Sequence, residues 1–262
     1  LDPAASGAFS VTNGVGITLA CGVVVDSTSN SAFTANGGAK LTAPSIIVAG
    51  NYSISNGAKI SPTPTAHAAA QNDPLAYIPA PAVGACNFTG FSLGWGTWTI
   101  SPGVYCGGIS IGNSATVTVN PGTYVLLGGG LNFGGGASIS GDGVTFYNTY
   151  DATHSYGAIQ MGNGASVTLS APTGGTLSGM LFFQDRSVVG GAASAFNGGA
   201  SLNLTGALYF PTTGMSYSNG VKAPYTILVA KTISFSGGVK INNDYSSLAN
   251  GSPVKGTAAI CE

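Results

Sequence analysis

Charged residues are scarce in this sequence. Only 6% of its 262 residues are Asp, Glu, Lys or Arg, against about 25% in an ordinary globular protein. The seven basic residues are scattered along the chain and the formal net charge is -1. A basic patch, which binding to a phosphate backbone or an anionic membrane surface requires, is therefore missing from the sequence. We predict no nucleic-acid partner.

Long hydrophobic runs are also lacking, although 44% of the residues are hydrophobic. The apolar runs, such as residues 46–49 and 180–183, are only a few residues long, whereas a helix needs about 20 apolar residues to cross a bilayer. The sequence therefore predicts no transmembrane segment in this chain. A chain of this length can bury one large core, so we expect a single domain over residues 1–262.

Glycine is abundant, with 42 residues, and much of it falls in a repeated phrase. The phrase is Asn or Gly, then Gly, a small residue, and alternating apolar and polar residues. About nine copies recur, mostly about twenty residues apart, starting near residues 12, 36, 55, 112, 135, 162, 198, 219 and 237. Runs rich in β-branched residues separate the copies, which predicts strands. Gly and Asn suit turns in which φ is positive.

A repeat unit of this size cannot bury its own apolar face, so successive units are expected to stack. We predict an all-β fold, a parallel, right-handed β-solenoid (β-helix) of about nine coils. The scarcity of charge agrees with it, because equivalent positions of neighbouring coils lie about 4.8 Å apart and repeated charges would repel. The alternative is an antiparallel β-sandwich or barrel, which also uses short strands and glycine turns.

Two segments depart from the repeat. Residues 61–105 are rich in proline and are predicted to leave the solenoid as an excursion, in which residues 66–71 could form one short helix. Residues 245–262 are predicted to form a cap or tail, since an open solenoid end exposes unpaired strand edges.

The four cysteines include no C-x-x-C pair, which favours disulfides and an oxidising, extracytoplasmic compartment over a zinc site. Cys86 and Cys106 could close a loop of about twenty residues. In a stack of nine coils Cys21 and Cys261 would lie roughly 40 Å apart. Unless the tail runs back along the solenoid, a bond between them would join neighbouring molecules head to tail into a filament.

Candidate catalytic groups are few. Asp185 lies beside Arg186, the only arginine, and this pair could form the centre of a polysaccharide lyase or hydrolase. We favour the other interpretation, a structural ion pair or hydrogen-bond hub, and predict no catalytic residue. His67 and His154 are separated by many repeat units, so we predict no metal ligand and no cofactor.

Trp95 and Trp98 lie with Phe88 and Phe91 in the second half of the Pro-rich segment. Exposed aromatic side chains on a loop could stack on sugar rings. The alternative is that they cover one end of the hydrophobic core. Both interpretations remain open at the level of sequence.

Several ordered phrases extend over most of the chain: DPLA at 73–76, SPGVYCGGI at 101–109, NPGTY at 120–124, GVTFYNT at 143–149, FFQDRS at 182–187 and TGALYFP at 205–211. Together they resemble the C-terminal region of bacterial TadG-like proteins of the Tad/Flp pilus-assembly type. The resemblance implies an extracytoplasmic region associated with the cell surface or a pilus. It transfers no catalytic residues.

We therefore expect a non-catalytic, secreted protein of the bacterial cell surface with a structural or adhesive role. Its partners would be pilus or other surface components, or copies of itself joined end to end in an extracellular filament. The alternatives are a carbohydrate-active enzyme centred on Asp185 and Arg186, and a glycan-binding module that uses Trp95 and Trp98.

Overall fold

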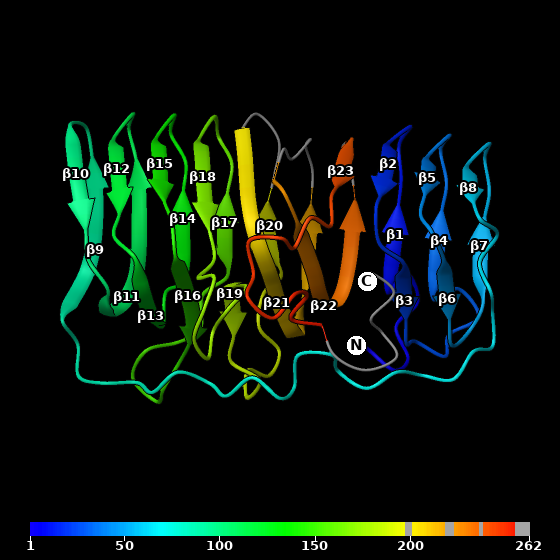
Figure 1. Ribbon diagram of the computed structural model, residues 1–262, viewed down its shortest axis with the longest axis horizontal. Coiled ribbons are helices and arrows are strands. Elements are labelled where there is room, and N and C mark those ends of the chain that lie inside the picture. The colour runs from blue at the N-terminus through cyan, green and yellow to red at the C-terminus, as the bar shows by residue number, and fades with distance from the viewer. Residues whose placement is uncertain (197–200, 218–222, 236–237, 255–262) are drawn as a thin grey trace.

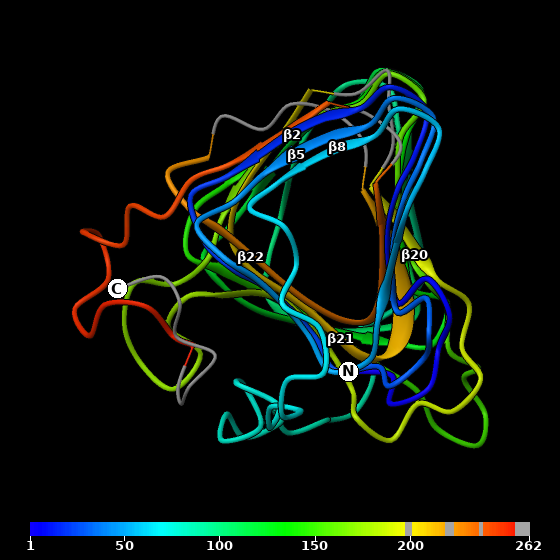
Figure 2. The same cartoon turned by 90° about the vertical axis from the view of Figure 1, so that its right-hand side faces the viewer.

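The computed structural model describes residues 1–196, 201–217, 223–235 and 238–254. These residues form 23 β-strands and no helix, so none of them belongs to a helix that could cross a membrane. Seen along its long axis, the molecule has a triangular outline with strands on three sides (Figure 2). Neighbouring strands pair in parallel along that axis (Figure 1).

The strands are distributed over the three sides as follows. The first side holds β10 (Thr97–Ile100), β12 (Thr116–Val119), β15 (Ser138–Gly141), β18 (Ser166–Ser170), the start of β21 (Ser201–Tyr217), β23 (Val239–Ile241), β2 (Gly16–Leu19), β5 (Lys40–Thr42) and β8 (Lys59–Ser61). The second side holds β9 (Phe88–Gly94), β14 (Leu131–Phe133), β17 (Ile159–Met161), β20 (Ser194–Phe196), β1 (Phe9–Val11), β4 (Phe33–Ala35) and β7 (Tyr52–Ile54), with the ends of β11 (Gly103–Gly112), β21 and β22 (Thr226–Phe235). The third side holds β13 (Gly122–Leu127), β16 (Val144–Thr149), β19 (Met180–Gln184), β3 (Val23–Val25), β6 (Ile46–Val48) and other parts of β11, β21 and β22.

The repeated phrase forms these strands and turns for local reasons. In β12, Val117 and Val119 point into the core, whereas Thr116 and Thr118 are exposed, as the alternation of a half-buried strand requires. The Gly and Asn residues that precede such strands have positive φ, which confirms the predicted turns: Asn13, Gly14, Gly37, Gly38, Asn56, Gly57, Asn113, Gly135, Gly136, Asn163 and Gly164.

The predicted β-solenoid of about nine coils is wrong. Eight strands close a ring of parallel pairings, in the order β11–β13–β16–β19–β21–β20–β17–β14 and back to β11. The centre is thus a closed parallel β-barrel, and the remaining strands lie outside this ring. Every pairing between the named strands is parallel, so the antiparallel alternative is wrong as well.

The ring closes because two long strands turn corners of the triangle. β11 pairs with β13 through residues 103–106 and with β14 through residues 109–111. Between them Gly108 has a φ of 80°, and a Cβ atom there would lie 2.2 Å from the carbonyl oxygen of Gly130. Only glycine permits this bend and this approach of two backbones. β21 likewise pairs with both β19 and β20.

The order of strands along the molecule differs from their order in the chain. β1 pairs with β22 and β2 pairs with β23, so the first strands of the chain follow its last strands (Figure 1). The two ends of the molecule are formed by β9 with β10 and by β7 with β8. The predicted stacking in chain order, and with it the separation of roughly 40 Å between the first and last coils, is wrong.

Residues 62–87, here called the strap, connect the two ends. The strap leaves β8 at one end and runs along the third side to β9 at the other (Figure 1). It contains no helix, so the helix considered for residues 66–71 is absent. The segment that leaves the strands is also shorter than the predicted excursion of residues 61–105, because β9, β10 and the start of β11 lie between residues 88 and 105.

Two groups of buried side chains stabilise the molecule. The first fills the interior and includes a column of aromatic rings with centroids 5.2 to 5.8 Å apart: Tyr105, Tyr124, Phe146 and Phe182. At the end of the molecule the partly exposed ring of Phe88 continues this column, 4.5 Å from Tyr105. The second lies outside the third side, where Leu75 and Ile78 of the strap and Leu248 of the C-terminal segment cover it. All residues of β16 and β19 are consequently buried. Residues 245–254 therefore pack on a side of the molecule, and residues 255–262 lie outside the described part.

Candidate functional site

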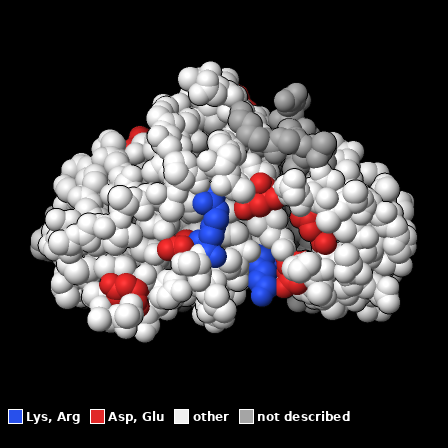
Figure 3. Space-filling view, turned by 90° about the horizontal axis from the view of Figure 1, so that it is seen from below, with Lys and Arg blue, Asp and Glu red and all other residues white. Residues whose placement is uncertain are grey.

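One face of the molecule carries several charged side chains. Figure 3 shows most of the visible acidic and basic groups near the middle of this face. Asp185 and Arg186, the predicted candidate pair, follow directly after β19. Each of these two residues makes several side-chain hydrogen bonds.

Arg186 is directed toward the strap. Its Nε atom donates a hydrogen bond to the hydroxyl of Tyr209 at 2.7 Å. Its Nη1 and Nη2 atoms donate to backbone carbonyl oxygens of the strap, those of Ile78 at 3.0 Å and Leu75 at 2.8 Å. The guanidinium also lies 4.9 Å from the ring centroid of Phe183 and 5.0 Å from that of Tyr209. All three nitrogens thus have partners, and two of them bind the strap directly.

Asp185 points to different partners. Its Oδ2 atom accepts hydrogen bonds from the hydroxyls of Tyr147 at 2.9 Å and Thr149 at 2.6 Å. Its Oδ1 atom accepts from the backbone N–H and the hydroxyl of Ser187, both at 2.8 Å. The ion pairs that the described residues form do not include Asp185 with Arg186. The arrangement is that of a hydrogen-bond hub at a corner.

The protonation of this cluster follows from its surroundings. Desolvation alone would raise the pKa of Asp185, but the hydrogen bonds from Thr149, Ser187 and Tyr147 outweigh it and hold the pKa below its ordinary value. Burial, with the neighbouring carboxylate of Asp185, raises the pKa of Tyr147 to about 12. Asp185 is therefore an ionised acceptor near neutral pH, with its lone pairs already engaged, and is poorly suited to be a general acid.

Asp73 is the member of this cluster that sequence reasoning missed. Its Oδ2 atom accepts a hydrogen bond from Tyr209, the same hydroxyl that accepts from Arg186. Asp73 and Tyr209 lie 136 residues apart in the chain, so no spacing could have indicated the contact. In the sequence, the only indication that these residues belong together was their place in two of the phrases that carry the family resemblance. Asp73 lies in DPLA and Arg186 lies in FFQDRS.

Trp95 and Trp98 lie at the end of the molecule formed by β9 and β10. Their side chains are 72% and 46% exposed, and the indole N–H of Trp98 donates to the backbone oxygen of Trp95 at 2.6 Å. Trp98 is the register partner of Val117, which points into the core. Trp98 therefore occupies an inward position at the last strand, as expected for a residue that covers a core end.

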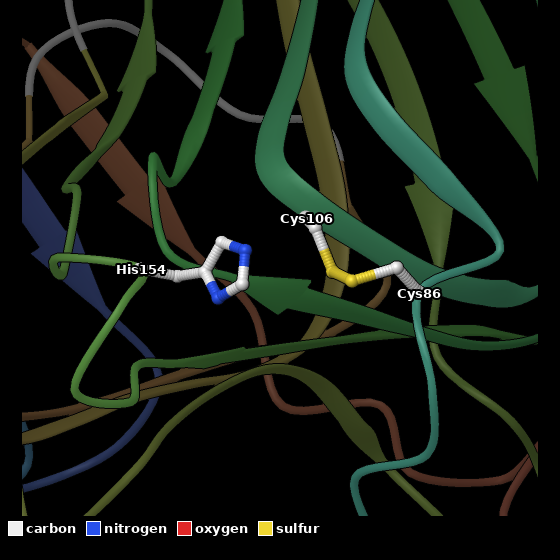
Figure 4. Close-up of side chains that lie close together, drawn as sticks. All are labelled: Cys86, Cys106 and His154. Atoms are coloured by element: carbon white, nitrogen blue, oxygen red, sulfur yellow. A yellow bond between two sulfur atoms is a disulfide. The ribbon is translucent and has the colours of Figure 1, made fainter.

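The predicted disulfide between Cys86 and Cys106 is confirmed, with Cα atoms 5.7 Å apart. It joins the end of the strap to β11. His154 lies beside it (Figure 4), and the two sulfur atoms and an imidazole nitrogen all lie within 4.8 Å of one another. The sequence predicted no role for His154, which is 48 residues beyond Cys106 and near it only in the folded chain.

Cys21 is placed differently from the prediction. Its Sγ atom lies 3.6 Å from the hydroxyl of Tyr245, in the C-terminal segment. Both residues line a cleft of about 170 Å³ where the N-terminal and C-terminal strands meet, between β3 and β22. Cys21 therefore lies in the middle of the molecule, away from both ends, and Cys261 lies outside the described residues.

Comparison with known proteins gives no relative: the chain matches no family model, no curated protein and no solved structure.

Proposed function

We propose that this protein is a non-catalytic structural protein of the bacterial cell surface that assembles end to end. The observation that carries the proposal is that side chains at inward positions are left half exposed at both ends of the molecule. Interior positions elsewhere along the strands are almost completely buried. Exposed apolar surface at a strand edge is typical of an interaction site.

The end formed by β9 and β10 is the more aromatic one. Phe88 is 36% exposed although its register partner, Tyr105, is fully buried. Trp98 is 46% exposed next to the buried Val117. Within the described structure β10 pairs only with β12, and β9 only with β11. This end therefore presents both apolar side chains and unpaired backbone groups.

The opposite end has the same character. Ile54 is 37% exposed, whereas its partner Ala35 in β4 is buried. Ile60 in β8 is half-buried and stands next to the buried Leu41. As far as the described residues go, β7 pairs only with β4 and β8 only with β5. A second hydrophobic strand edge is thus available.

The two ends can complement each other because all strands are parallel. The free edge of β9 and β10 faces one direction along the axis and that of β7 and β8 the other. A contact between unlike ends of two copies would continue the parallel pairing, at a strand spacing of about 4.8 Å. Such a head-to-tail contact leaves the far ends free, so it generates a filament.

The cellular setting is inferred from chemistry and resemblance. The Cys86–Cys106 disulfide is typical of an oxidising, extracytoplasmic compartment. The resemblance to TadG-like proteins favours association with a pilus or the cell surface. The hydrogen-bonded state of Asp185 and Arg186 supports a structural rather than a catalytic role for that pair.

Two variants test the assembly. Trp98→Lys alters one end and Ile54→Lys alters the other, while Val189→Lys replaces a 91% exposed apolar side chain away from both ends. Sedimentation velocity and electron microscopy should show concentration-dependent linear oligomers for the wild type and for Val189→Lys. Either end variant alone should remain monomeric. Their mixture should form dimers and nothing larger, because each retains one intact end.

Two results would overturn the proposal. One is a wild type that remains monomeric at high concentration. The other is a set of oligomers that neither end variant changes.

Glycan binding is the second candidate function, and the 72% exposure of Trp95 favours it. Aromatic rings exposed in this way stack on sugars. A glycan array probed with the wild type and with Trp95→Ala separates the two functions. Loss of a wild-type glycan signal in Trp95→Ala, together with unaltered monomeric sedimentation, would favour the glycan-binding module.

A further inference from the structure

The neighbourhood of the Cys86–Cys106 disulfide contains the parts of a second kind of site. The two sulfur atoms and His154 lie within 4.8 Å of one another, and Figure 4 shows the imidazole ring directed toward the sulfurs. Two cysteines and one histidine are a common ligand set for zinc. While the disulfide is intact, the sulfurs are bonded to each other and offer no thiolate.

The position of His154 is fixed by two features. Asp151 Oδ1 lies 2.9 Å from the Nδ1 atom of His154 and accepts a hydrogen bond from it in the tautomer that is protonated at Nδ1. In that tautomer the Nε2 atom keeps its lone pair. At Gly128, φ is 72° and a Cβ atom would lie 2.7 Å from the Cβ atom of His154, so only glycine leaves room for the histidine.

A carboxylate that orients a histidine in this way is the usual second partner of a metal ligand. The backbone N–H groups of Thr153 and His154 also donate hydrogen bonds to Asp151 Oδ1, at 2.8 and 2.7 Å, and fix the carboxylate in place. The pair can keep the imidazole directed at the sulfurs.

We propose that reduction of the Cys86–Cys106 disulfide converts this cluster into a Cys₂His site for a zinc ion. A dithiol supplies two electrons and two protons, so that the S–S bond breaks, two cysteine thiols form and the dithiol becomes its own disulfide. Zinc then binds both sulfurs as thiolates and displaces their two protons. His154 supplies the third ligand, and water completes the tetrahedron.

The geometry permits this site. Metal–ligand bonds of about 2.0 to 2.3 Å place the ligand atoms of a tetrahedral zinc roughly 3.5 Å apart. The two sulfur atoms and the imidazole nitrogen now lie within 4.8 Å of one another. Because the Cα atoms of the cysteines are only 5.7 Å apart, rotation of the side chains is sufficient to bring the three ligand atoms to the spacing of a tetrahedral site. Cys86 is exposed and Cys106 buried, which leaves one open approach for the reductant and the metal.

The site would give the protein two alternative states. The oxidised state has a covalent bond between the strap and β11, and the reduced state has a metal link between the same two segments. Zinc would hold the sulfurs as thiolates and oppose their reoxidation. The strap thus stays attached to β11 in both states. A disulfide that only packed against a histidine would lose this attachment when it is reduced.

The test uses the complete protein in both redox states. One sample is reduced with excess dithiol and transferred without oxygen into metal-free buffer, and the other is left oxidised. Each is titrated with Co²⁺, whose thiolate charge-transfer band reports sulfur ligands, and then with Zn²⁺ as competitor. The reduced protein should bind one ion per chain and the oxidised protein at least 100-fold more weakly.

Three variants identify the ligands. His154→Ala should weaken binding by the reduced protein at least tenfold, and Asp151→Asn about 10- to 100-fold, as for other partners of metal ligands. His67→Ala, which alters the other histidine of the chain, should bind as the wild type does. Equal binding in both redox states, or unchanged binding by His154→Ala, would overturn the proposal. So would a reduced protein that loses its circular dichroism spectrum and does not regain it with zinc.

Discussion

The Nε atom of Arg186 donates a hydrogen bond to the hydroxyl of Tyr209, and that hydroxyl in turn donates to Asp73 of the strap. The rest of the guanidinium binds two backbone carbonyls of the strap. Arginine suits this role because its planar group presents donors in several fixed directions. The only arginine of the chain therefore fastens the segment that connects the two ends of the molecule.

Replacing Arg186 should destabilise the protein strongly. Arg186→Met removes three hydrogen bonds and leaves the carbonyls of Leu75 and Ile78 without that donor, so we expect a loss of about 2 to 4 kcal/mol in the free energy of unfolding. Lys231→Met is the control, since it removes a partly exposed ion pair with Asp2 at 3.5 Å and should cost less than about 1 kcal/mol. Urea unfolding measures both. Equal small losses would contradict the role of Arg186.

Acid should weaken the Asp185 hub. The pKa of this carboxyl is below its ordinary value in the folded protein, so its stabilising effect is complete above the unfolded pKa of about 3.9 and is lost as the pH falls toward the folded pKa. Asp185→Asn should thus be less stable than the wild type at about pH 6, with a difference that shrinks below about pH 4. Thr149→Val, which removes one donor to Asp185, should show a weaker pH dependence than the wild type. A difference that stays constant with pH would exclude this explanation.

The scarcity of charge can be tested on the exposed positions of the first side. Thr116, Ser138 and Ser166 are consecutive register partners and all are exposed. Ser138→Lys alone should change the free energy of unfolding by no more than about 0.5 kcal/mol. Lysine at all three positions should cost more than the sum of the single changes, because like charges then stand about 4.8 Å apart.

Salt and charge reversal provide the controls for this experiment. Added salt should reduce the excess cost of the triple lysine variant. A variant with Lys, Glu and Lys at the same positions should lack that excess. The native chain places Lys40 beside Lys59 but has Gly16 as the next partner, so this row does not continue to a third lysine. Additive costs in the triple variant would show that repulsion is not the reason for the missing charge.

The Cys86–Cys106 disulfide should contribute measurably to stability. Its partners are 20 residues apart, and a loop of this size corresponds to about 3 kcal/mol in the chain-entropy model. The double variant Cys86→Ala, Cys106→Ala, measured in the presence of a chelator, should lose about this amount of unfolding free energy. A double variant as stable as the wild type would show that the strap is held without the bond.

Any end-to-end assembly should be non-covalent. Cys21 lies beside Tyr245 in the middle of the molecule, so it is not placed to join two copies at their ends. On a non-reducing gel the denatured wild type should run as a monomer, even when it is taken from a sample rich in oligomers. A ladder of disulfide-linked species would contradict this prediction and support a covalent filament.

Local features of the structure could be predicted well from the sequence. Turns with positive φ at Asn13, Asn56 and Asn163 follow from the repeated phrase, because only Gly and Asn adopt this conformation readily. The alternation of Val117 and Val119 with exposed threonines in β12 follows from the period of a strand. The bond between Cys86 and Cys106 could be anticipated because the two bracket one short segment.

The pairing of distant strands could not be predicted. The copies of the phrase are nearly alike, so the pattern within β1 or β22 does not specify which strand lies beside which. For the same reason the sequence favoured a solenoid in chain order, whereas the corner at Gly108 lets β11 close the ring of eight strands. The contacts of Arg186 with Leu75 and of His154 with the disulfide arise only from this arrangement.

The sequence alone thus determined where the chain turns, which side chains point inward and how little charge the surface carries, since these depend on each residue and its immediate neighbours. Only the tertiary structure decided that the first strands follow the last, that the strap runs between the two ends, and that Cys86, Cys106 and His154 meet. These choices depend on the summed packing of many similar strand edges, which no local pattern encodes.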